Sequence, residues 1–211
     1  MTFDPPEDEG SEGRWKRHRE EESSSNGLRI FAIVVVALLL ILAGVAFFAG
    51  RPIAFSVIQR KTAGKFPEIR WVKSAELASW RADSLRQQPV VLDARTETEF
   101  DVSHLPDATR IDPYRPLLRP LKGLPESVPI AVYSSVGYRG ARVAHWLAAQ
   151  GYTNVQNLQG GIFSWANDDH PLVRQGGPTT EVHPYQPRWG FLLESGHRID
   201  APALEKRSAA P

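Results

Sequence analysis

The feature that most constrains this chain is an uncharged run of 21 residues, "IFAIVVVALLLILAGVAFFAG", from Ile30 to Gly50. The run contains no proline, and Arg29 and Arg51 flank it. As a helix it would be about 31 Å long at 1.5 Å per residue, which matches the hydrocarbon core of a bilayer. A soluble amphipathic helix would show a polar face, and this run has none. We therefore expect a transmembrane helix at residues 29–51.

A cleaved signal peptide is the main alternative for this run. Its apolar region would be shorter, about 7–15 residues, and a cleavage site of small residues would follow it. We therefore expect a single-pass membrane protein whose first partner is the lipid bilayer. The side on which the rest of the chain lies is not predicted, because the 15 residues on each side of the run carry four Lys or Arg and the positive-inside rule depends on a difference.

Composition excludes several classes of function. The chain has 211 residues, a net charge of +1 and no cysteine. Without cysteine there are no disulfides, thiolate metal sites or thiol nucleophiles. The near-neutral charge gives no reason to expect nucleic acid as a partner. The six histidines show no spacing typical of metal ligands, so we expect neither a metal nor a cofactor.

Short apolar runs alternate with helical patterns after the hydrophobic segment. "PVVLDAR" and "PIAVYS" have the composition of buried parallel strands. Thr96 and Glu99 match a capping box at the start of a helix. "YRGARVAHWLAAQGY" predicts a longer helix that ends at Gly151. The fold class is therefore α/β, with a mostly parallel central sheet flanked by helices.

Five segments are predicted along the chain. They are a disordered N-terminal tail at 1–28, the transmembrane helix at 29–51, a connector at 52–66, the α/β domain at 67–173 and a partly disordered C-terminal extension at 174–211. The tail is rich in Glu, Ser, Pro and Gly and has no apolar periodicity.

The stretch "VYSSVGYRGARVAHWL" predicts a strand, a glycine-containing loop and a helix. The loop consists of Ser134, Ser135, Val136, Gly137, Tyr138 and Arg139. Backbone N–H groups in such a turn, together with the helix N-terminus, favour an anion. Arg139 adds a full charge, which either binds that anion or pairs with an acidic neighbour, and the sequence leaves both open.

Residues 70–173 resemble a rhodanese-homology domain, the sulfurtransferase fold. The resemblance rests on four motifs in order: "VVLDARTETEF", "SHLPDA", "YSSVGYRGARVAHWL" and "NLQGGIFSWANDDHPLV". In that family the first residue of the loop is the cysteine that carries the persulfide, and here it is Ser134. Two further departures are Asp107, where the family has glycine, and Gly140, where a small hydroxyl residue is common. The resemblance implies that Asp93 and Arg95 brace the site.

The serine decides what the resemblance implies for function. An alcohol does not carry sulfane sulfur as a cysteine persulfide does, so we expect a domain without sulfurtransferase activity and no catalytic residue. Such a domain would bind a small oxyanion or a protein partner at the loop. The alternative is an enzyme with residual sulfurtransferase-type or Ser134-dependent hydrolase activity, which would need a nearby base. His104 and His145 are the candidates for that base, and their positions favour neither.

Overall fold

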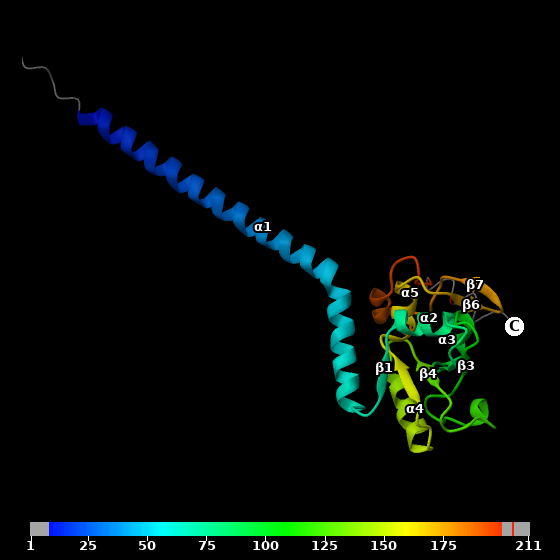
Figure 1. The fold of residues 1–211 in the computed structure, drawn as a ribbon. Coiled ribbons are helices and arrows are strands. Elements are labelled where there is room, and N and C mark those ends of the chain that lie inside the picture. Colours follow the sequence, from blue (N-terminus) through cyan, green and yellow to red (C-terminus); the bar gives the residue numbers. More distant parts are fainter. Residues whose placement is uncertain (1–8, 200–203, 205–211) are drawn as a thin grey trace, which may run out of the picture. The chain divides into compact units, whose positions relative to one another are not determined.

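The structure is a computed structural model that describes residues 9–199 and 204 (Figure 1). Its elements in chain order are α1 (Glu9–Lys65), β1 (Arg70–Val72), α2 (Ser74–Ala82), β2 (Val90–Asp93), α3 (Glu97–Val102), β3 (Thr109–Arg110), η1 (Arg119–Leu121), β4 (Ile130–Tyr133), α4 (Tyr138–Ala149), β5 (Val155–Leu158), α5 (Gly161–Asn167), β6 (Leu172–Arg174), β7 (Gly177–Thr179) and η2 (Pro187–Leu192). The α/β fold class predicted from the sequence is confirmed.

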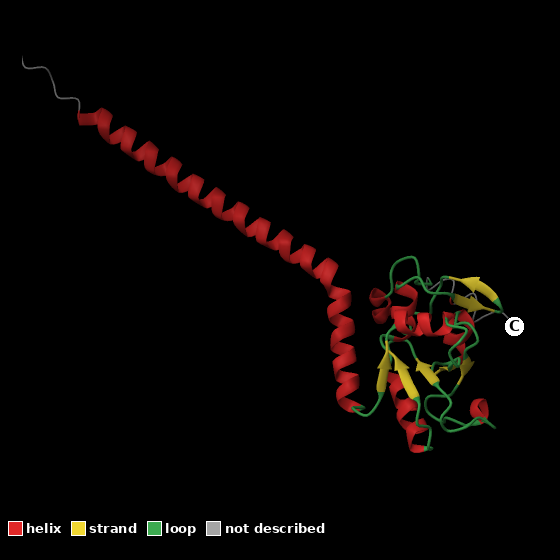
Figure 2. Ribbon diagram, viewed as in Figure 1, coloured by secondary structure: helices red, strands yellow, loops and turns green. Residues whose placement is uncertain are grey.

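Five short parallel strands form the central sheet in the order β1-β5-β4-β2-β3. The central strand β4 is buried along its whole length, as expected for a parallel strand covered on both faces. The parallel arrangement brings the carboxyl ends of the strands to one edge of the sheet (Figure 2). The loop after β4 therefore lies at the edge where ligands bind in open α/β sheets.

Alternate side chains of β4 enter two separate cores. Ala131 and Tyr133 pack with α2 and α5, whereas Ile130 and Val132 pack with α4. This division follows from the strand period of two residues. The helices thus cover both faces of the sheet and fix the direction in which α4 leaves the loop.

Helix α1 differs from the predicted segments at both of its ends. It begins at Glu9, so residues 9–28 are helical where the composition predicts disorder, and residues 1–8 of the predicted tail lie outside the described residues. Glu, Lys and Arg are good helix formers, and a helix that already exists extends at little cost. Residues 52–65 of the predicted connector also belong to α1.

The chain divides into two compact units after Gly50. In the second unit the last turns of α1 pack on the domain, with Phe55 and Ile58 against one core and Thr62 buried. In the part of the chain that the structure describes, no single helix meets the length and hydropathy of a membrane span, although Arg29–Val45 and Gly50–Lys65 meet them as a pair. The span at 29–51 stays a prediction.

The C-terminal extension adds apolar side chains to the domain. Val182, Leu192 and Leu193 are buried in the same core as α2 and α5. The antiparallel pair β6 and β7 leads into the extension, which includes the 3₁₀ helix η2. Residues 200–203 and 205–211 of the predicted extension lie outside the described residues.

The two further departures from the family pattern, Asp107 and Gly140, have a local reason in the fold. Asp107 has a positive φ of 59°, a conformation that Asp tolerates better than most residues, and its carboxylate pairs with Arg81 at 3.1 Å. Gly140 lies where α4 crosses β4 and β5. A Cβ atom there would lie 2.2 Å from Oδ1 of Asn157 and 3.1 Å from the carbonyl carbon of Tyr133.

Gly140→Ala should therefore destabilise the domain. Because the backbone of β4 cannot move away without disturbing the sheet, we expect the free energy of unfolding to fall by about 2 kcal/mol. The measurement is chemical unfolding of the full chain in detergent, followed by tryptophan fluorescence. Gly64→Ala is the matched control, since nothing lies within 4 Å of a Cβ at Gly64 and alanine favours helix. Equal unfolding midpoints for the two variants would contradict the packing described here.

Candidate functional site

The loop from Ser134 to Arg139 joins the carboxyl end of β4 to the start of α4. Gly137 is the N-cap of α4 and has φ of 100°, a left-handed conformation that favours glycine. Nδ2 of Asn157 on β5 donates a hydrogen bond to the carbonyl oxygen of Gly137 at 2.8 Å. The turn is therefore held from the neighbouring strand as well as by its own conformation.

The start of α5 holds the other end of the loop. The N–H groups of Ile162 and Phe163 donate to the carbonyl oxygens of Ser134 and Ser135 at 2.9 and 3.2 Å. This contact requires glycine at position 161, because a Cβ there would lie 2.0 Å from the Ser134 carbonyl oxygen. The glycine pair at the start of α5 thus allows close packing on the loop. The N–H groups of the two residues that follow it are used by carbonyl oxygens of the protein.

Ser134 lies inside the loop, with 1% of its surface exposed. Its Oγ accepts a hydrogen bond from the N–H of Gly137 at 3.1 Å. Among the described residues, no acceptor is found for the N–H groups of Val136, Tyr138 and Arg139. The last two open helix α4, where unpaired N–H groups carry partial positive charge. The loop thus keeps donors that an anion would use.

Arg139 pairs with a carboxylate of the protein itself. Its Nη1 and Nη2 donate to the two carboxylate oxygens of Glu99 at 2.7 and 2.6 Å, and both side chains are buried. Ser135 Oγ donates to Glu99 at 2.7 Å and accepts from Arg139 at 2.9 Å. Of the two alternatives that the sequence leaves open for Arg139, the structure contains the salt bridge. An anion at the loop would meet an arginine whose charge is already balanced.

The capping box brings Glu99 into this pair. Thr96 and Glu99 exchange the two hydrogen bonds of a capping box at the start of α3, as the sequence predicts. Burial raises the pKa of Glu99, but the hydrogen bonds and charge of Arg139, with the charge of Arg95, outweigh burial and hold that pKa at about 2. Glu99 is therefore a carboxylate at any physiological pH.

Asp93 and Arg95 form a second buried pair behind the loop. Arg95 donates to Asp93 through Nε and Nη2, the latter at 2.7 Å, and also to the carbonyl oxygen of Ser103. The hydroxyl of Tyr133 donates to Asp93 at 2.6 Å. Burial lowers the pKa of Arg95, but the charge of Asp93 outweighs it and raises that pKa above its ordinary value. The pair braces the end of β4 and does not line the pocket described next.

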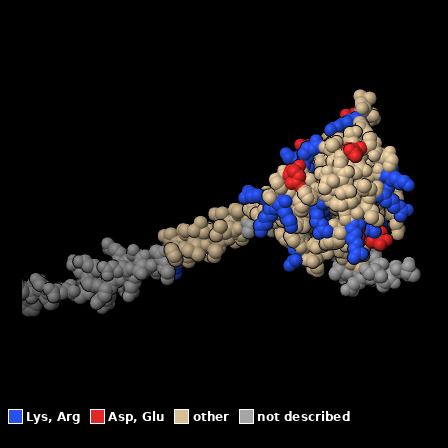
Figure 3. Space-filling model, turned by 90° about the horizontal axis from the view of Figure 1, so that it is seen from below, with Lys and Arg blue, Asp and Glu red and all other residues tan. Residues whose placement is uncertain are grey.

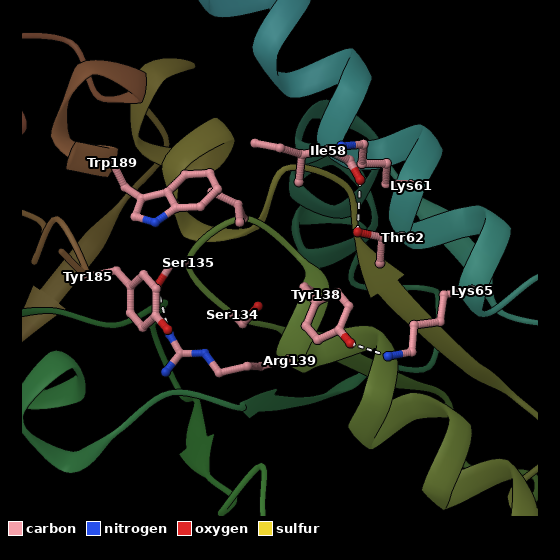
Figure 4. A pocket seen from close by; sticks show the side chains of 11 residues that line it. Ile58, Lys61, Thr62, Lys65, Ser134, Ser135, Tyr138, Arg139, Tyr185 and Trp189 are labelled. Atoms are coloured by element: carbon pink, nitrogen blue, oxygen red, sulfur yellow. Dashed lines mark hydrogen bonds between the residues drawn. The ribbon is translucent and has the colours of Figure 1, made fainter.

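A pocket of about 480 Å³ opens over the loop (Figure 4). Three segments far apart in the sequence form its walls: the end of α1, the loop itself and the C-terminal extension. The lining residues are Ile58, Lys61, Thr62, Lys65, Ser134, Ser135, Val136, Tyr138, Arg139, Tyr185 and Trp189.

Sequence reasoning missed the wall that α1 contributes. In the sequence analysis Lys61 and Lys65 counted only as basic residues that follow the apolar run. Their spacing of four residues would have placed them on one face of a helix. Lys65 Nζ donates to the Tyr138 hydroxyl at 2.6 Å. From the extension, the ring of Tyr185 lies 4.6 Å from the Arg139 guanidinium, in a cation–π contact.

Neither histidine considered as a base lines the pocket. Nδ1 of His104 lies 3.0 Å from the carbonyl oxygen of Leu105, and Nδ1 of His145 contacts Glu68. Within residues 9–199 and 204, no group of three or more His, Asp or Glu is placed to hold a metal ion.

Comparison with known proteins identifies the domain around this loop. Residues 75–168 match the family model of the Rhodanese-like domain. The chain is 29% identical to a sulfurtransferase of Allochromatium vinosum over 109 residues. The aligned residues cover 52% of this chain and 99% of that protein. The chain therefore contains a rhodanese-like domain that resembles sulfurtransferases, and it has no cysteine.

Other similarities cover smaller parts of larger proteins. A tRNA uridine(34) hydroxylase of Shouchella clausii is 35% identical over 94 residues, which is 42% of this chain and only 29% of that enzyme. The solved structure of a thiosulfate sulfurtransferase from Pseudomonas aeruginosa is 26% identical, with a TM-score of 0.45, and the match covers 50% of this chain and 20% of that chain.

Glu99→Gln tests the buried pair. The variant leaves the Arg139 charge buried without a partner, so the free energy of unfolding should fall by about 3 kcal/mol at pH 7. Since folding lowers the pKa of Glu99 from 4.5 to about 2, this contribution is complete above pH 4.5 and is lost as the pH falls towards 2. Unfolding of the full chain in detergent between pH 2 and 7 measures it.

The exposed Glu97 on the same helix provides the control for this experiment. Glu97→Gln should change the free energy of unfolding by less than about 0.5 kcal/mol at every pH. A Glu99→Gln variant that keeps a constant difference from the parent down to pH 2 would contradict the assignment, because a protonated Glu99 and the glutamine that replaces it should then behave alike.

Proposed function

We propose that this rhodanese-like domain transfers no sulfur and binds a small oxyanion non-covalently at the loop from Ser134 to Arg139, on a chain anchored in a membrane by residues 29–51. Chemistry by the family's route needs a thiolate that attacks the donor sulfur and keeps it as a persulfide. Serine stays protonated near neutral pH and does not form the equivalent species. The protein would then act by occupancy of its pocket, without turnover.

The position of Ser134 is the observation that supports this proposal most. Its hydroxyl lies at the carboxyl end of the central strand, buried, with a backbone N–H directed at its oxygen. The surrounding loop has a glycine turn, anchors from β5 and α5 and unpaired N–H groups, so donors for an anion lie close to Ser134. A buried polar loop of this kind is suited to a polar ligand.

A Ser134-dependent hydrolase would require a base beside the serine. Among the residues that line the pocket, the basic side chains are Lys61, Lys65 and Arg139. Lys65 donates to Tyr138 and Arg139 pairs with Glu99. No described side chain hydrogen-bonds to Ser134 Oγ from the position of a general base. This geometry favours binding over hydrolysis.

The apolar run supports the membrane part of the proposal. Large side chains from Ile30 to Leu42 are exposed by a third to two thirds of their surface. A continuous apolar surface of this size is unfavourable in water and is typical of a segment in contact with lipid or another protein. Its length and lack of charge suit lipid.

Ser134→Cys should create sulfur transfer in a protein that lacks it. The new thiolate would attack the outer sulfur of thiosulfate, break the S–S bond and release sulfite, and cyanide would then remove the sulfur as thiocyanate. We expect thiocyanate formation at least about 100-fold above the parent, because the loop donors lower the pKa of the new thiol. Ser79→Cys is the control, because it introduces the same thiol at an exposed serine that does not line this pocket.

Two results would overturn the first part of the proposal. One is thiocyanate formation by the parent that Ser134→Ala abolishes. The other is the absence of thiosulfate binding to the parent in isothermal titration, which would remove the oxyanion as the ligand.

Leu40→Arg combined with Val36→Arg tests the anchor. Each arginine at the centre of a spanning helix costs about 3 kcal/mol on insertion scales. We expect the parent to float with phosphatidylcholine vesicles after alkaline carbonate treatment and the double variant to be released. A Val36→Leu, Leu40→Ile variant keeps the hydropathy and should behave as the parent. Release of the parent itself would disprove the anchor.

A further inference from the structure

The pocket over the loop extends well beyond the matched rhodanese-like region. Residues 75–168 supply its floor through the loop. Helix α1 supplies Ile58, Lys61, Thr62 and Lys65, and the C-terminal extension supplies Tyr185 and Trp189. The two added walls belong to this chain and not to the matched domain, so they determine which ligand the loop receives.

The two added walls differ in chemistry. Figure 4 shows Trp189 and Tyr185 on one side of Ser134, and Lys61, Thr62 and Lys65 of α1 on the other side. Ile58 and Val136 add aliphatic surface. An inorganic oxyanion is far smaller than about 480 Å³ and would leave these apolar groups against water. The dimensions and walls suit a ligand that also has an apolar body.

The charge of the pocket is positive once its ion pairs are considered. Arg139 is neutralised by Glu99. In the part of the chain that the structure describes, Lys61 and Lys65 have no carboxylate partner. Lys65 uses one N–H on the Tyr138 hydroxyl and keeps others for a ligand. Basic side chains also outweigh acidic ones over the face of the domain in Figure 3.

We infer that the pocket binds a small organic anion, in which an aromatic or short alkyl body carries one oxyanion group. The body lies against Trp189, Tyr185 and Ile58. The oxyanion lies between Lys61, Lys65 and the N–H groups at the start of α4. This inference rests on the proposed function and adds the class of ligand. It makes the residues before and after the matched domain the determinants of specificity.

Matched ligands separate the two contributions. Isothermal titration of the full chain in a non-ionic detergent, with detergent alone subtracted, would compare benzenesulfonate, methanesulfonate and benzyl alcohol. Benzenesulfonate should bind about tenfold more tightly than methanesulfonate because the ring buries apolar surface. Benzyl alcohol has the ring without the charge and should bind at least about tenfold more weakly than benzenesulfonate.

Matched variants assign the walls. Lys61→Gln should weaken benzenesulfonate and methanesulfonate by a similar factor, about fivefold, with a smaller effect at high salt. Trp189→Leu should weaken benzenesulfonate alone. The exposed Lys122, which is not among the lining residues, gives the control Lys122→Gln, which should change neither.

Three outcomes would overturn the inference. Equal affinity for benzenesulfonate and methanesulfonate would show that the apolar walls are not used and would leave the proposed binding of small oxyanions intact. If the parent protein bound neither benzenesulfonate nor methanesulfonate, the result would contradict the proposed function as well. Unchanged binding in Lys61→Gln and Trp189→Leu, with a normal unfolding transition for each variant, would place the ligand elsewhere.

Discussion

The buried pair of Glu99 and Arg139 determines how the loop after β4 is built. Placing two charges in a protein interior is favourable only when their remaining donors and acceptors are satisfied. Here Thr96 and Ser135 complete the shell of Glu99, and Arg139 lies against the ring of Tyr185. One carboxylate thus joins the start of α3, the loop and the start of α4. The same pairing removes the arginine as a free anion-binding group, so the charge available to a ligand comes from α1.

The site therefore combines the loop of a sulfurtransferase-like domain with a changed chemistry. The glycines at 137 and 161 and the side chain of Asn157 hold a loop that is suited to negative charge. The atom at its centre is an oxygen that accepts a hydrogen bond, where a sulfurtransferase needs a sulfur that attacks. The pocket above it has cationic and aromatic walls. These properties are the basis of the proposal that the pocket binds its ligand reversibly and without turnover.

Much of this arrangement was predictable from the sequence, and the exceptions share a cause. The alternation of apolar runs and helices predicted the α/β class, and the Thr96–Glu99 spacing predicted the capping box, because both depend on neighbours in the chain. The partner of Arg139 could not be chosen, since Glu99 lies 40 residues away and several acidic residues competed for the role. Lys61, Lys65 and Trp189 were missed as pocket residues because their role depends on packing between distant segments.

The docking of the last turns of α1 on the domain has a consequence for how a signal could travel. Phe55 and Ile58 pack against the core, and Thr62 on the same helix is buried, so this stretch of α1 is docked on the domain. A ligand bound beside Lys65, as proposed, would stabilise the docked helix, and by reciprocity undocking of the helix would weaken binding of that ligand. Because this stretch directly follows the apolar run in the sequence, the proposed ligand would bind beside the part of the chain that continues from that run.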